Sequence, residues 1–182
     1  MRYFKRRMFS LIRAGVYFVL LLLAVVVVTS VIDKQKVAVH FSPNRAVQDV
    51  VIDALDSAQD HIYLAMFYMS NQDIVNALVR AKERGLDVFA VFDDSQRKSF
   101  RFFRHGVNLR IRGIPVRYGG VSYKMHSKFA VVDGAKVLTG SYNWTESAEK
   151  KNVEDFVVIE SDEIAREYEE QFVHIWETSE NP

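Results

Sequence analysis

The stretch that decides the fold is residues 123–160, YKMHSKFAVVDGAKVLTGSYNWTESAEKKNVEDFVVIE. Within it, the apolar runs KFAVV (128–132) and AKVLTG (135–140) are separated by Asp133-Gly134, a dipeptide typical of a two-residue hairpin turn. VEDFVVIE (153–160) has the pattern of a further strand. The segment therefore predicts three strands with polar residues in their connections.

Strand and helix patterns alternate along the remainder of residues 37–182. Apolar runs predict strands at 37–41, 61–67, 86–92 and 116–118. Helical periodicity predicts helices over 45–58, 71–84 and 162–176, and within 97–112. This order predicts an α/β domain in which a mixed β-sheet is flanked by helices.

The N-terminal segment has the pattern of a membrane anchor. Residues 1–13 are basic, and residues 14–32 form an uncharged run whose length as a helix matches a bilayer core. The positive-inside rule then places the N-terminus in the cytoplasm and the domain formed by residues 37–182 outside it. A cleaved signal peptide, which would give a secreted protein, is the competing interpretation. In a eukaryote the anchor could instead lie in the mitochondrial outer membrane.

Composition restricts the chemistry. The chain of 182 residues contains no cysteine, which excludes a disulfide framework, cysteine-ligated zinc and a thiol nucleophile. Residues 37–182 are net acidic, yet residues 95–132 hold nine Lys or Arg and no Asp or Glu. We expect this basic run to form a localised anion site. The interleaved Phe100, Phe102 and Phe103 are expected in the core.

Polar residues of the first stretch have the spacing of a site. His126 and Lys128 are two apart, so both point to one face of an extended strand, and Ser141 and Asn143 have the same spacing after Gly140. A neutral imidazole can attack an anionic phosphodiester without charge repulsion, and an ordinary histidine pKa of about 6.5 keeps it largely neutral at pH 7.

The neighbouring residues suit the same reaction. Lys128, Ser141 and Asn143 can donate hydrogen bonds to phosphate oxygens. Glu154 can accept the proton on the other ring nitrogen of His126 and so fix its tautomer. Asp133 is expected to have a supporting, structural role in bonding local backbone.

The pattern H-x-K-x4-D-x6-G-S-x-N, which runs from His126 to Asn143, resembles the signature of the phospholipase D superfamily. The chain is similar in detail to small members with a single motif: bacterial periplasmic endonucleases and the mitochondrial cardiolipin hydrolase/Zucchini group. The stretch GSYNWT (140–145) and Asn152-x-Glu154 are similar in both. The likeness covers most of residues 37–176 and implies a phospholipase D-like fold.

The resemblance also implies a mechanism. His126 would form a phosphohistidine, Lys128, Ser141 and Asn143 would bind the phosphate, and Glu154 would orient His126. No metal or other cofactor is required. Two imidazoles are needed and one motif is present, so the resemblance implies a homodimer with both copies of His126 at its interface.

The substrate stays open at this point. A nuclease acting on DNA or RNA is the leading interpretation. A phospholipase D-type hydrolase of cardiolipin or phosphatidylcholine, releasing phosphatidic acid, is the alternative, because residues 33–36 alone separate the anchor from the first strand. A non-catalytic module that binds single-stranded nucleic acid is a third interpretation. A metallohydrolase is a weaker fourth, because Lys128 stands where a metal site needs a ligand.

Overall fold

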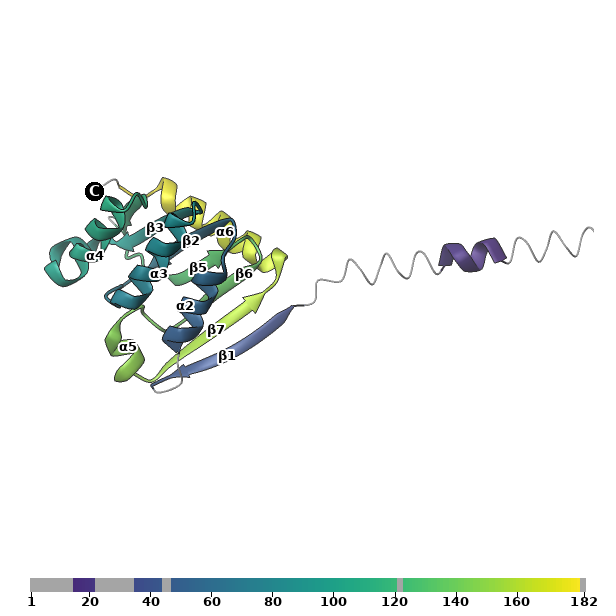
Figure 1. Cartoon of the computed structure of the whole chain (residues 1–182), viewed down its shortest axis with the longest axis horizontal. Helices are drawn as coiled ribbons and strands as arrows, with labels where there is room; N and C mark the ends of the chain where they lie inside the picture. Colours follow the sequence, from purple (N-terminus) through teal and green to yellow (C-terminus); the bar gives the residue numbers. More distant parts are fainter. Residues whose placement is uncertain (1–14, 22–34, 44–46, 121–122, 181–182) are drawn as a thin grey trace, which may run out of the picture. The chain divides into compact units, whose positions relative to one another are not determined.

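The computed structural model describes residues 15–21, 35–43, 47–120 and 123–180 (Figure 1). The chain separates into two compact units, Met1–Lys34 and Gln35–Pro182. In the first unit, residues 15–21 are helical, whereas the remainder of the predicted span and the basic segment before it lie outside the described residues. Within the described ranges, no helix has both the length and the hydrophobicity needed to span a bilayer.

Seven strands in the described part of the second unit form one sheet, in the order β1-β7-β6-β5-β2-β3-β4. Their bounds are β1 Lys36–Ser42, β2 His61–Met66, β3 Asp87–Asp93, β4 Val116–Gly119, β5 Lys128–Val132, β6 Lys136–Gly140 and β7 Glu154–Glu160. β2, β3 and β4 run parallel, and every other neighbouring pair is antiparallel. The predicted mixed sheet is confirmed.

Helices cover both faces of this sheet (Figure 1). The helical segments are α2 Val47–Ser57, α3 Gln72–Glu83, the 3-10 helix η1 Asp94–Lys98, α4 Phe100–Ile111, α5 Glu146–Lys150 and α6 Asp162–Glu177. α2 and α3 pack on one face through residues such as Val51 and Leu78. α6 packs on the other face through Phe172 and Ile175, as its periodicity predicts.

β5 separates the two cores. Ala130 and Val132 belong to the cluster beneath α2 and α3, whereas Phe129 and Val131 belong to the cluster beneath α6. Successive side chains of a strand point to opposite faces. A strand covered on both faces therefore has the continuous apolar run found at 129–132.

The structure differs from the sequence predictions at two connections. The β5–β6 turn contains three residues rather than two, because Val132 pairs with Lys136, and both Asp133 and Gly134 have positive φ. The short helix α5 is an element that the periodicity missed. It begins where the Thr145 hydroxyl accepts a hydrogen bond from the Ala148 N–H.

The expectation that three phenylalanines lie in the core is wrong for two of them. The side chain of Phe100 is 82% exposed and that of Phe103 is 37% exposed. Phe102 is partly buried, and its ring stacks on Tyr68 at a centroid distance of 4.6 Å. The reason is that α4 lies beyond α3 near one side of the sheet, where it covers less of the core (Figure 1).

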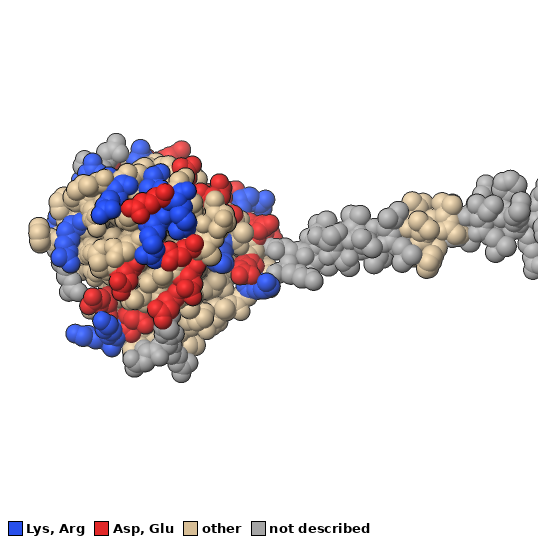
Figure 2. Space-filling view, viewed as in Figure 1, with Lys and Arg blue, Asp and Glu red and all other residues tan. Residues whose placement is uncertain are grey.

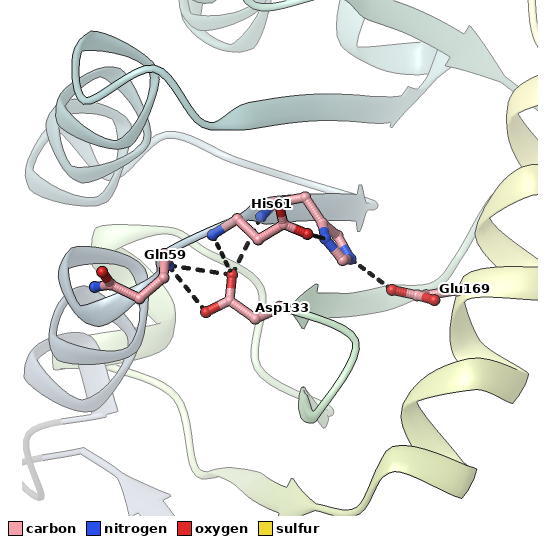
Figure 3. Close-up of polar contacts among 5 residues, drawn as sticks. Gln59, His61, Asp133 and Glu169 are labelled. Atoms are coloured by element: carbon pink, nitrogen blue, oxygen red, sulfur yellow. Dashed lines mark hydrogen bonds and ion pairs between the residues drawn. The ribbon is translucent and has the colours of Figure 1, made fainter.

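Asp133 joins the far end of β5 to the loop before β2 (Figure 3). Its carboxylate accepts hydrogen bonds from the backbone N–H groups of Gln59, Asp60 and His61, at 2.9, 2.8 and 3.1 Å. These contacts are structural, and they lie at the opposite end of β5 from Lys128.

His61 connects the start of β2 to α6 (Figure 3). Its ring nitrogens lie 2.8 Å from Asp60 Oδ2 and 2.6 Å from Glu169 Oε1. Burial alone lowers the pKa of His61, but hydrogen bonds and charges from the two carboxylates outweigh burial, so the pKa is raised above its ordinary value. The folded state therefore favours the imidazolium.

We expect His61→Gln to lower the free energy of unfolding by about 1–2 kcal/mol at mildly acidic pH. Because folding raises this pKa, the contribution is fully present below the ordinary pKa of about 6.5 and is lost as pH rises through the folded-state value. Urea unfolding of the wild type and the variant, at about pH 5.5 and again near pH 9, measures the change. His40→Gln is the control, because the His40 ring packs on Phe156. An equal loss for His61→Gln at both pH values would contradict the assignment.

Candidate active site

Antiparallel pairing brings one end each of β5, β6 and β7 together, and we call this the site end of the sheet. β5 begins at Lys128, β6 ends at Gly140 and β7 begins at Glu154, and the three strands alternate in direction. The site end therefore holds six of the seven predicted site residues: His126, Lys128, Gly140, Ser141, Asn143 and Glu154. Asp133 is the one that lies at the other end.

His126 and Lys128 form a basic pair beside an aromatic ring. Lys128 Nζ lies 3.3 Å from His126 Nδ1 and donates a 2.9 Å hydrogen bond to the His126 carbonyl oxygen. The His126 ring packs on Phe67 with centroids 4.3 Å apart. Loss of hydration, and then the charges of Lys128 and Lys124, lower the pKa of His126. This shift favours the neutral imidazole, which is the form that can attack phosphorus.

Glu154 is held by two neighbours on its own side of the site. Ser141 Oγ donates a 2.5 Å hydrogen bond to Glu154 Oε2, and Asn152 Nδ2 donates a 2.8 Å hydrogen bond to Oε1. Within the described part of the chain, Glu154 makes no hydrogen bond to the His126 ring, although the sequence predicted one. The carboxylate acts on Lys128 instead: burial lowers the pKa of Lys128, and the Glu154 charge partly opposes that shift.

Asn143 is oriented by the segment that follows β2. Its side-chain oxygen accepts a hydrogen bond from the Tyr68 N–H at 3.3 Å, so its NH₂ group is the donor left to face a phosphate. Trp144, whose side chain is 1% exposed, fixes the same loop. Its carbonyl oxygen accepts hydrogen bonds from the N–H groups of Ser70 and Asn71.

Two residues of the site were not predicted. Asp93, buried at the end of β3, accepts a 3.0 Å hydrogen bond from the Met125 N–H and so fixes the loop that carries His126. Phe67 lies directly after β2. The centroid of its ring is 5.0 Å from Lys124 Nζ, and the same ring contacts His126. An aspartate and an aromatic residue at strand ends are weak signals. They gain meaning only once β2 is known to pair with β5, and β3 with β2.

The basic run 95–132 does not form one continuous anion site. Arg97 Nε lies 3.3 Å from a carboxylate oxygen of Asp94, and Arg117 donates a 2.7 Å hydrogen bond to the Trp176 carbonyl oxygen. Figure 2 likewise shows basic and acidic side chains interspersed on the face that it displays. The basic residues whose charges act on the His126 ring are Lys124 and Lys128.

Comparison with known proteins identifies the family. The family model described as "Cardiolipin synthase, PLD-like domain" matches residues 51–176, a range that contains the whole site end. This chain is a member of the phospholipase D superfamily. The resemblance noted in the H-x-K pattern of His126 and Lys128 is therefore confirmed.

Individual relatives agree with this membership. A phospholipase D of Rickettsia conorii is 32% identical over 139 residues, which cover 76% of this chain and 68% of that protein. A mitochondrial cardiolipin hydrolase of Danio rerio is 34% identical over 130 residues, which cover 71% of this chain and 56% of that protein. The solved structure of Nuc, a phospholipase D family member from Salmonella typhimurium, matches with a TM-score of 0.78 and 32% identity, covering 82% of this chain and 99% of that one. The chain is thus a phosphoric diester hydrolase with the predicted phospholipase D-like fold.

Proposed function

We propose that this chain is a membrane-anchored phosphodiesterase that cleaves nucleic acid without a metal ion, through a phosphohistidine at a homodimer interface. The observation that carries the proposal is the position of the His126 ring at the site end, where Lys128 Nζ lies 3.3 Å from its Nδ1. Ser141 and Asn143 lie in the loop that follows β6 at the same end of the sheet, and Ser141 donates a hydrogen bond to Glu154 at the start of β7.

In the proposed reaction, an imidazole nitrogen of His126 attacks phosphorus as the bond to the leaving oxygen breaks. Lys128 and Asn143 hold the phosphate oxygens while charge builds on them, and the Ser141 hydroxyl joins them by turning its proton from Glu154 to the phosphate. The active dimer holds one neutral and one protonated copy of His126, and the protonated copy gives its proton to the leaving oxygen. That copy then takes a proton from the water that attacks the phosphohistidine, the phosphorus–nitrogen bond breaks, and both rings return to their starting states.

The homodimer is proposed because it supplies the second imidazole. Apolar side chains exposed next to the site end support a contact there. Phe41 of β1 is 44% exposed and pairs with Asp155 of β7, and Val153 is 89% exposed directly before Glu154. Burying such side chains against a second copy is favourable, and a two-fold axis would bring both copies of His126 to one phosphate.

Phospholipid is the second candidate substrate, and two observations favour it. Relatives from Rickettsia conorii and Danio rerio are named phospholipase D and mitochondrial cardiolipin hydrolase. The proposed anchor, residues 14–32, ends just before β1, whose Val37 and Val39 side chains are 59% and 53% exposed. With the N-terminus in the cytoplasm, this arrangement would keep the domain outside and close to the bilayer.

The test uses the full chain in detergent, with EDTA present. We expect labelled single-stranded DNA to be cleaved, and vesicles of cardiolipin or phosphatidylcholine to release little phosphatidic acid. The His126→Asn protein, prepared in the same way, reveals any contaminating nuclease. Intact DNA together with released phosphatidic acid would move the assignment to the lipid substrate. No cleavage of either substrate by folded, dimeric protein would overturn the proposal.

A further inference from the structure

A cavity of about 470 Å³ opens beside His126, between the loop that carries it and α6. We propose that this cavity is a subsite for the nucleoside attached to the scissile phosphate. The proposal rests on the proposed function and adds to it the group that is recognised next to the reacting phosphorus. The cavity exceeds what a phosphate alone fills, so a further part of the substrate has room beside His126.

α6 forms one wall with residues at helical spacing. Gln171, His174, Ile175 and Thr178 are separated by three, one and three residues, which puts them on a single face of the helix. Three of these four carry hydrogen-bonding groups, and the amide of Gln171 both donates and accepts. This combination matches the edge of a nucleobase, which presents donors and acceptors side by side.

The loop opposite α6 supplies an aromatic surface. Tyr123 lines the cavity, and its side chain is 88% exposed, although it lies only three residues before His126. An exposed aromatic ring next to a phosphate-binding residue is the arrangement on which proteins stack unpaired bases. A glycerol headgroup has no flat face for this ring to stack on.

The charge of the cavity argues against cationic headgroups. Among the described residues that line it, none is Asp or Glu, and Lys124 contributes a positive charge. Choline and ethanolamine carry a positive charge that needs carboxylates or a cage of aromatic faces. A neutral base whose phosphate lies next to His126 and Lys124 suits the lining better. The geometry therefore favours a nucleoside over a lipid headgroup.

The experiment compares three phosphodiesters with the same leaving group, p-nitrophenol. The other ester group is thymidine, joined through its 5′ oxygen, glycerol or methyl. The full chain in detergent is assayed as wild type, Tyr123→Ala and Gln171→Ala. Gln72→Ala is the matched control, because Gln72 is also an exposed helical glutamine and it bonds Asn76 on α3, away from the cavity.

We expect each cavity variant to lose about 10-fold in kcat/KM on the thymidine ester. On the methyl ester, which leaves the cavity empty, we expect a change of less than about twofold. Gln72→Ala should match the wild type on all three substrates.

Equal losses on the methyl and thymidine esters would overturn the subsite, because the variants would then act on the phosphate site itself. A loss confined to the glycerol ester would also overturn it and would make the cavity a headgroup site. Failure of the proposed function would give a different result, because the wild type would then hydrolyse none of the three esters. That result would also overturn the subsite.

Discussion

Replacing His126 by asparagine is expected to reduce phosphodiester hydrolysis at least about 1,000-fold, because the nucleophile is lost while the phosphate-binding groups stay. Asparagine keeps a polar side chain of similar size but cannot form the covalent intermediate. The His126 ring is exposed at the end of a loop, so the fold does not depend on it. Initial rates on single-stranded DNA in EDTA measure the effect.

His40→Asn is the matched control for this variant, since His40 lies on β1 and its ring contacts Phe156. Circular dichroism of both variants should equal that of the wild type. If His126→Asn kept a tenth or more of the wild-type rate, His126 would not be the nucleophile.

Mixed dimers extend the same prediction to the homodimer. When wild-type and His126→Asn chains are co-expressed in equal amounts, random pairing leaves about one quarter of the dimers with both imidazoles. If one phosphate needs both copies of His126, activity per total protein falls to about one quarter of the wild-type value. Activity of one half would show that each subunit works alone. Differently tagged chains allow the mixed species to be isolated and assayed directly.

The site was predictable from sequence to the extent that its residues are close in the chain. His126, Lys128, Ser141 and Asn143 belong to one stretch of hairpin and loop, where strand periodicity alone places them at one end of the sheet. The strands themselves were predictable for the same reason, because each is a short apolar run between turn residues.

What the sequence left undetermined depends on contacts between distant segments. Asp93 reaches the loop of Met125 across the sheet, and Phe67 meets His126 because β2 pairs with β5. No local sequence pattern predicts either of these two contacts. Glu154 was expected to meet the His126 ring, yet Ser141 and Asn152 occupy its carboxylate. Spacing predicts which residues share an end of the sheet, whereas side-chain partners depend on exact three-dimensional geometry.

Gly140→Ala is expected to destabilise the protein by about 3 kcal/mol or more. Gly140 ends β6 with φ +144°, in a region that disfavours a side chain. A Cβ at this position would lie 2.3 Å from the Asp155 carbonyl oxygen and 2.9 Å from the Phe156 Cα, both of which are backbone atoms of β7. The two strands would have to separate, and the Ser141–Glu154 contact lies across the same junction. Activity is therefore expected to fall together with stability.

Gly85→Ala separates the steric clash from the cost of the backbone conformation. Gly85 follows α3 with φ +93°, and a Cβ built there meets no atom within 4 Å. Gly85→Ala is therefore expected to lower the free energy of unfolding by only about 1 kcal/mol, the cost of placing a side chain at positive φ. Gly85 also lies away from the site end. Urea unfolding followed by tryptophan fluorescence compares the two variants, and DNA cleavage in EDTA compares their activities. Equal destabilisation by Gly140→Ala and Gly85→Ala would show that β7 moves to accommodate the new methyl group at little cost. A Gly140→Ala protein with full activity would show that the close approach of β6 and β7 is not what holds Ser141 and Glu154 in register.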